Sequence, residues 1–117
     1  MNYREEVEQF INQFPITHSV TLDIDFRYSF NRTQKYQDLF KQDLKIFIHQ
    51  LNRRFFGRQT SKSDYRDELP IVIPCIENLH NRYEPIHFHI ALGNLREDKF
   101  TEQEIIEKIY KSWNSTQ

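Results

Sequence analysis

Apolar residues recur at helical spacing in two parts of the first half of the chain. Residues 3–14 and residues 33–56 each place apolar side chains three or four positions apart, which is the pattern of an amphipathic helix. Between them, residues 17–26 alternate apolar and polar side chains, which predicts a strand with one buried face. Pro15 closes the first helical pattern and Gly57 closes the second.

Two short apolar segments and a third helical pattern follow in the second half. Residues 70–77 and 85–93 predict strands, and Pro74 places the first of them at a sheet edge or at a bulge, because proline cannot donate to the ladder. Capping-box patterns at 31–34 and 101–104 predict where the long helix and the last helix begin. The predicted order is αβαββα, and it favours an α+β fold in which helices pack on an antiparallel sheet.

The composition favours one small domain that spans residues 1–117. The net charge of −1 provides no global attraction to nucleic acid, so such binding would need a local basic patch. The single cysteine, Cys75, cannot form an internal disulfide, which favours a reducing compartment. No apolar run approaches the length of a membrane span, so we expect a cytoplasmic protein without a membrane partner.

The triplet His87-Phe88-His89 in the last predicted strand suggests a metal site. Side chains along a strand alternate between its faces, so the two histidines share one face and Phe88 belongs to the core. Glu77, one strand away, adds a carboxylate. Two neutral imidazoles and one carboxylate leave coordination positions open, and they predict Mg²⁺ or Mn²⁺, with Zn²⁺ also compatible with the ligand types. A polar strand edge that binds no metal is the alternative explanation.

These segments resemble a known family. The stretch 75–80, Cys-Ile-Glu-Asn-Leu-His, followed by 85–92, Pro-Ile-His-Phe-His-Ile-Ala-Leu, resembles the metal motif of the HUH-type replication initiators. These are the Rep endonucleases of rolling-circle plasmids, single-stranded DNA viruses and filamentous phages. Residues 20–24, Val-Thr-Leu-Asp-Ile, are similar to the first motif of the family. The resemblance covers roughly residues 17–95 and implies a Rep-like fold.

The resemblance also implies a reaction and a set of site residues. In the family a tyrosine attacks a phosphate of single-stranded DNA and forms a 5′-phosphotyrosyl link, while a divalent ion polarises the phosphate. Carried over to this chain, the resemblance implies Glu77, His87 and His89 as the metal ligands. It also implies that Thr21 and Asp23 lie near the DNA or the metal.

The chain departs from the family at the nucleophile. The family places its tyrosine in a Tyr-x-x-Lys motif, and none of the six tyrosines here is followed three positions later by lysine. Tyr110 lies on the helix after the metal strand, but its spacing from Ile106 and Trp113 predicts a core residue. No catalytic residue is assigned from the sequence, and enzymatic activity stays open.

Basic residues gather where the long helix ends and in the polar stretch 58–69, which predicts a loop. They are Arg53, Arg54, Arg58 and Lys62, with Arg66 further along. Cations near a helix C-terminus are favourable through the helix dipole alone. The alternative is a patch that contacts phosphates, which would make nucleic-acid binding strongly salt-dependent.

Two functions follow from the residues and the resemblance. The first is a Rep-like domain that binds a divalent metal and single-stranded DNA but cannot nick alone, either as the N-terminal part of an initiator or as a short protein that lost the nicking step. The second is a non-catalytic protein of a phage, plasmid or other mobile genetic element. It would reuse the scaffold to bind and inhibit a host factor, as an anti-CRISPR or other anti-defence protein does.

Overall fold

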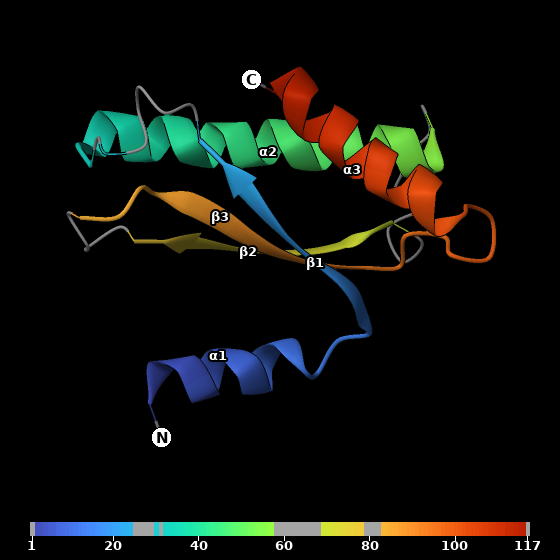
Figure 1. Cartoon of the computed structure of the whole chain (residues 1–117), viewed down its shortest axis with the longest axis horizontal. Helices are drawn as coiled ribbons and strands as arrows, with labels where there is room; N and C mark the ends of the chain where they lie inside the picture. Colours follow the sequence, from blue (N-terminus) through green and yellow to red (C-terminus); the bar gives the residue numbers. More distant parts are fainter. Residues whose placement is uncertain (1, 25–29, 31, 58–68, 79–82, 117) are drawn as a thin grey trace.

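The computed structural model describes residues 2–24, 30, 32–57, 69–78 and 83–116. Within these residues three helices and three strands follow one another in the order αβαββα, and the predicted α+β class is confirmed (Figure 1). The elements are α1 (Tyr3–Ile11), β1 (Ile16–Asp23), α2 (Gln34–Phe56), β2 (Ile71–Glu77), β3 (His87–Gly93) and α3 (Glu102–Thr116). The first helix is shorter than predicted because a turn occupies residues 12–15.

The three described strands form an antiparallel sheet with β3 in the centre, in the order β1-β3-β2. The register aligns Thr21, His89 and Cys75 in one row across the sheet, and Asp23, His87 and Glu77 in the next. Pro74 lies on β2, at one edge of this sheet, and its side chain is exposed. The predicted edge position of this proline is therefore confirmed.

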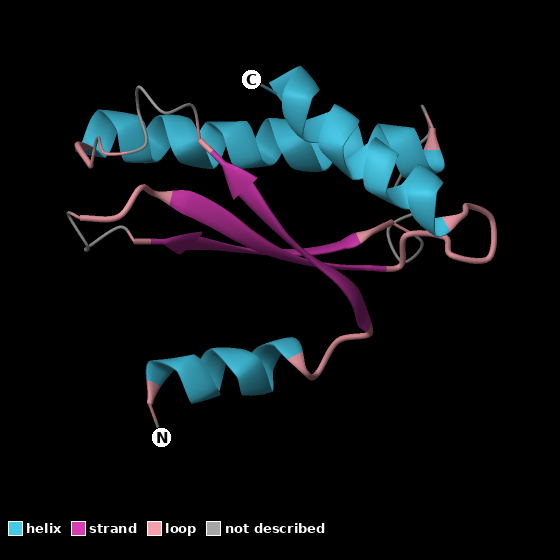
Figure 2. Cartoon of the chain, viewed as in Figure 1, coloured by secondary structure: helices cyan, strands magenta, loops and turns pink. Residues whose placement is uncertain are grey.

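One face of the sheet packs against α2 and α3 and forms the core (Figure 2). The ring of Trp113 on α3 lies edge-on to Phe47 of α2 at 5.8 Å and to Phe88 of β3 at 5.6 Å between ring centroids. Its indole Nε1–H donates to the backbone oxygen of Asp23 at 3.1 Å. Such aromatic contacts join both helices to the central strand.

Tyr110 is not a core residue, and that prediction is wrong. The buried positions of α3 are Ile105, Ile109, Ser112 and Trp113. With 3.6 residues per turn, Tyr110 lies beside this stripe, toward solvent, and it is 48% exposed. Which face of a helix becomes buried depends on the element that packs against it. The spacing of Tyr110 along the sequence therefore did not determine whether its side chain is buried.

The helix ends follow local chemistry. At the start of α3 the backbone N–H of Thr101 donates to Glu104 Oε1 at 3.0 Å, and the N–H of Glu104 donates to Thr101 Oγ1 at 3.2 Å, which confirms this capping box. The N-cap of α2 is Thr33, whose side chain makes no capping bond, so the box predicted at 31–34 does not form there. Gly57 ends α2 as predicted, with a φ of 93°.

The first helix, α1, lies on the opposite side of the sheet from α2 and α3 (Figure 1). The sheet is therefore a middle layer, with its core face toward two helices and its outer face toward one. None of the helices in the described part of the chain combines the length and the apolar character that crossing a membrane requires.

Candidate metal centre

The three predicted ligands meet at one corner of the outer face of the sheet. Glu77 is the last residue of β2, His87 is the first residue of β3, and the antiparallel register pairs them directly. His89 follows two residues along β3 and therefore shares the face of His87, while Phe88 between them is fully buried on the core face. The alternation predicted from the sequence is thus the observed one.

The ligand atoms of the three side chains lie close together. His87 Nε2 is 2.9 Å and His89 Nε2 is 2.8 Å from Glu77 Oε2, and the two Nε2 atoms are 3.2 Å apart. The side chains of His87, His89 and Glu77 are 20%, 39% and 43% exposed, so solvent reaches the group from one side. Two imidazoles and a carboxylate in this arrangement are a group that can hold a metal ion.

Thr21 lies behind one of these ligands. It pairs with His89 across β1 and β3, and its Oγ1 is 3.0 Å from His89 Nδ1. The hydroxyl can donate a hydrogen bond to Nδ1 or accept one from an Nδ1–H. When it accepts, Nδ1 carries the proton and the lone pair of Nε2 is free for a metal, so Thr21 can select the ligating tautomer of His89.

Asp23 lies in the same row as His87 but plays a different part. Its side chain is exposed, and its backbone oxygen accepts the hydrogen bond from Trp113. Its carboxylate does not belong to the group of ligand atoms formed by the described residues. Thr21 and Asp23 are thus both brought to the row of the histidines, but only Thr21 touches one of them.

No pattern in the sequence pointed to Arg32, which joins the residue after β2 to a residue shortly before β3. Its Nη2 donates to the backbone oxygens of Asn78 at 2.7 Å and of Glu84 at 2.8 Å. Asn78 adopts a left-handed φ of 65°, and its side chain donates to the oxygen of Pro85 at 3.1 Å. These bonds tie together the two chain segments that flank Glu77 and His87. An asparagine directly after a strand was the one local hint of this turn.

The two described residues of the predicted basic patch do not join the metal group. Arg53 and Arg54 lie at the C-terminal end of α2, on the layer that covers the core face, whereas the histidines lie on the outer face (Figure 1). Arg53 is exposed, but Arg54 Nη2 donates to Ser115 Oγ at 2.7 Å and so ties α2 to α3. Arg58 and Lys62 lie outside the described residues.

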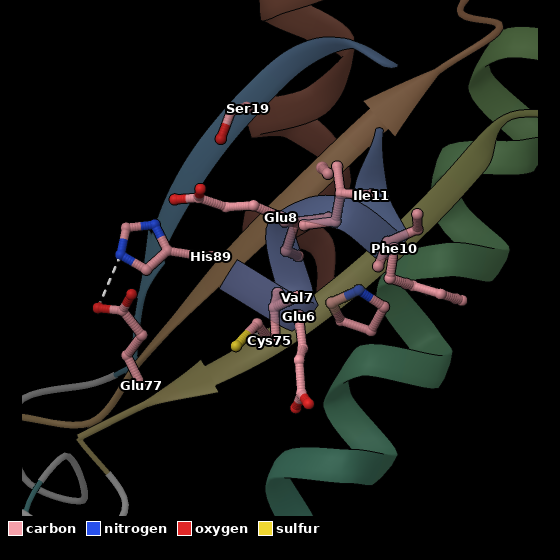
Figure 3. A pocket seen from close by; sticks show the side chains of 13 residues that line it. Glu6, Val7, Glu8, Phe10, Ile11, Ser19, Cys75, Glu77 and His89 are labelled. Carbon is pink, nitrogen blue, oxygen red and sulfur yellow. Dashed lines mark ion pairs between the residues drawn. The ribbon is translucent and has the colours of Figure 1, made fainter. Parts of the chain in front are cut away.

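A cleft of about 590 Å³ opens beside the metal group, between α1 and the outer face of the sheet (Figure 3). Glu77 and His89 form part of one wall, and Cys75 lies next to them. Cys75 is half-buried rather than fully buried, and burial, followed by the charge of Glu77, raises the pKa of its thiol. The contribution of α1 to this cleft had no counterpart in the sequence interpretation.

No tyrosine is found at this cleft among the side chains that the structure describes. Tyr36 and Tyr110 lie on helices of the opposite layer. Tyr83 lies in the connection between β2 and β3 and is 90% exposed.

Taken together, the fold and the site define an α+β domain with two histidines and a carboxylate arranged as a possible metal centre. No protein-family model, no curated protein and no solved structure matches this chain.

Proposed function

We propose that this chain is a Rep-like domain that binds Mg²⁺ or Mn²⁺ and, through the ion, single-stranded DNA. The observation that supports it is the triangle formed by Glu77 Oε2, His87 Nε2 and His89 Nε2, with sides of 2.9, 2.8 and 3.2 Å. The same residues carry the resemblance to the HUH motif. The resemblance therefore implies the same ligand set that the geometry brings together.

The ligand types suit Mg²⁺ or Mn²⁺, and Zn²⁺ is also compatible with them. Glu77 Oε2, His87 Nε2 and His89 Nε2 lie near enough to one another that one ion could take all three as ligands. Three protein ligands would leave coordination positions for a phosphate oxygen.

The charge of this group suits a phosphate. Glu77 contributes one negative charge and the ligating imidazoles are neutral, so a divalent ion keeps a net positive charge in the site. Bound there, the ion supplies Lewis acidity at a phosphate oxygen. His87 and His89 would hold the ion from the central strand, and the Thr21 hydroxyl, 3.0 Å from His89 Nδ1, can select the tautomer of His89 that leaves Nε2 free for it. Nicking is a separate step that we do not assign to this chain alone, because no described tyrosine side chain lines the cleft.

Thermal unfolding with Mn²⁺ tests the metal site. Binding to the folded state stabilises it by about 2.7 kcal/mol at a hundredfold excess over Kd, which raises the Tm of a domain of this size by several degrees. We expect this shift in the parent protein and in His49→Ala, a control on the exposed surface of α2. The double substitution His87→Ala and His89→Ala should abolish it. A parent protein with no shift, or a double variant that keeps the shift, would refute the metal site.

Fluorescence anisotropy with labelled oligo(dT) tests the nucleic-acid part. We expect binding in Mn²⁺ that is lost on chelation by EDTA and in the double histidine variant, and that weakens with salt. Equal affinity with and without the metal would separate DNA binding from the metal site and contradict the proposal.

The second candidate function is inhibition of a host factor by a protein that does not act on DNA. It is favoured by the position of Arg53 and Arg54, because these predicted phosphate contacts lie on the layer opposite the metal group. Its signature is Mn²⁺ binding without measurable affinity for single-stranded DNA. The same two experiments therefore decide between the candidates.

A further inference from the structure

The first helix covers the face of the sheet that carries the metal group, but it packs there loosely. None of its described side chains belongs to the buried core. Val7 and Ile11 are half-buried, while Phe10 on the next turn is 52% exposed. Instead of direct packing, the cleft of about 590 Å³ separates α1 from the strands (Figure 3). A helix of nine residues has little stability of its own, so its position depends on these few contacts.

Two carboxylates of α1 face the cleft, and one of them, Glu8, also pairs with the exposed Arg4 at 3.3 Å. Glu6 and Glu8 of α1 line it together with Glu77 and His89. In Figure 3 the carboxylate of Glu8 points into the cleft on the side of His89. Carboxylates beside the metal group would repel the phosphates of a nucleic-acid strand, and the repulsion is stronger in a partly enclosed space than in bulk water. With α1 in this position, a polyanion that enters the cleft passes these carboxylates.

We propose that α1 and a single strand of DNA compete for the outer face of the sheet, so that α1 is an acidic lid on the metal site. This inference rests on the proposed function, because it names what regulates access to the same site. Small ions pass the open cleft and reach the histidines while the lid is closed. A strand of DNA reaches them only when α1 moves away.

The attachment of α1 is suited to this movement. The chain after the helix is held at Pro15, whose carbonyl oxygen would lie 2.3 Å from a Cβ added at Gly93 of the central strand. The backbone there is in such close contact that the end of the connection is fixed. The N-terminus of the helix is capped locally, since Asn2 Oδ1 accepts a hydrogen bond from the N–H of Glu5 at 2.9 Å. The helix can therefore move as one unit about residues 12–15.

Locking the lid tests the proposal with the only cysteine of the chain. Val7 and Cys75 line the same cleft from opposite sides, so Val7→Cys can be joined to Cys75 by a short, reversible bis-methanethiosulfonate reagent. We expect the bridged protein to bind oligo(dT) in Mn²⁺ at least tenfold more weakly than the same protein after reduction. Its affinity for Mn²⁺ alone should change less than twofold. A monofunctional reagent that caps both thiols without joining them, and Gln9→Cys on the exposed side of α1, are the controls.

Releasing the lid should have the opposite effect. Val7→Ser with Ile11→Ser removes the two half-buried apolar side chains of α1 that line the cleft, and Glu6→Gln with Glu8→Gln removes the negative charges of α1 there. We expect each pair to tighten oligo(dT) binding several-fold, which damage to the fold would not do. Equal DNA affinity in the bridged and reduced forms, with Mn²⁺ binding intact, would overturn the lid alone. Loss of Mn²⁺ binding in the parent protein would instead overturn the metal site. Mn²⁺ binding without DNA binding in the released variants would overturn both the lid and the DNA part of the proposed function.

Discussion

Thr21 shows how a single side chain can change the chemistry of its neighbour. Its hydroxyl lies 3.0 Å from His89 Nδ1, on the side of the ring away from Glu77. A partner on the second nitrogen fixes both the rotation and the tautomer of a ligating imidazole. His87 Nε2 lies 2.9 Å from Glu77 Oε2 and 3.2 Å from His89 Nε2. Thr21 therefore supports the orientation of His89 from the side opposite these contacts.

Thr21→Val tests this positioning role. Valine keeps the shape of the side chain but removes the hydroxyl, so His89 loses its fixed tautomer, and we expect Mn²⁺ affinity to fall by about tenfold. Thr21→Ser keeps the hydroxyl and should stay within about twofold of the parent, as should Ser19→Ala on the same strand. Isothermal titration calorimetry measures all four proteins. Unchanged affinity in Thr21→Val would show that the contact does not support the metal site.

At the scale of elements, the central strand organises both faces of the domain. Its core-facing side chains are large and fully buried, whereas Ala91 and Gly93 on the other face are small. Gly93 admits the backbone of Pro15, which carries the chain from α1 into β1. Glycine is required here because of this close approach.

Gly93→Ala should therefore loosen the α1 side of the domain. The added Cβ would lie 2.3 Å from the oxygen of Pro15, and this neighbour is backbone that cannot rotate away. We expect a loss of roughly 1–3 kcal/mol in the free energy of unfolding, measured by urea denaturation. Alkylation of Cys75, which lines the cleft under α1, should become faster in the variant under native conditions. A variant with unchanged stability and unchanged alkylation would mean that the connection moves freely.

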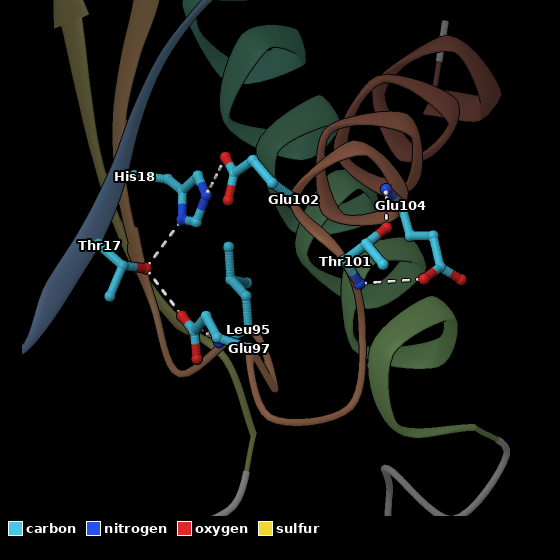
Figure 4. Close-up of polar contacts among 7 residues, drawn as sticks. All are labelled: Thr17, His18, Leu95, Glu97, Thr101, Glu102 and Glu104. Carbon is cyan, nitrogen blue, oxygen red and sulfur yellow. Dashed lines mark hydrogen bonds and ion pairs between the residues drawn. The ribbon is translucent and has the colours of Figure 1, made fainter.

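At the scale of the whole molecule, a polar network joins segments that are far apart in the chain (Figure 4). Thr17 of β1 donates to Glu97 Oε1 at 2.9 Å, and His18 Nε2 is 2.8 Å from Glu102 Oε1 on α3. The backbone N–H of Leu95, after β3, also donates to Glu97 at 3.3 Å. The network holds the start of the first strand to the connection between β3 and α3.

Acid should weaken this network. Burial acts to raise the pKa of the Glu97 carboxyl, but hydrogen bonds from its own backbone N–H, from Thr17 and from Leu95 together hold that pKa below its usual value. A lowered pKa in the folded state adds stability above the usual glutamate pKa of about 4.3, and this stability is lost as the pH falls through the lowered value. Glu97→Gln should therefore have a lower Tm than the parent at pH 7, and the difference should disappear in acid. A difference in Tm that does not change with pH would point to altered geometry rather than charge.

The sequence by itself determined the helices and strands and the membership of the candidate metal group. Both depend on local periodicity: alternation along a strand puts His87 and His89 on one face whatever surrounds the sheet, and a proline in β2 excludes the centre. It could not determine which layer each helix joins, because that depends on contacts between residues distant in the chain. Only the tertiary structure placed α1 over the metal face, and Arg53 and Arg54 on the other side of the sheet. Only the tertiary structure also showed that Tyr110 faces solvent. A periodic pattern gives the position of a side chain around its own helix, but it does not say which side of that helix packs against another element.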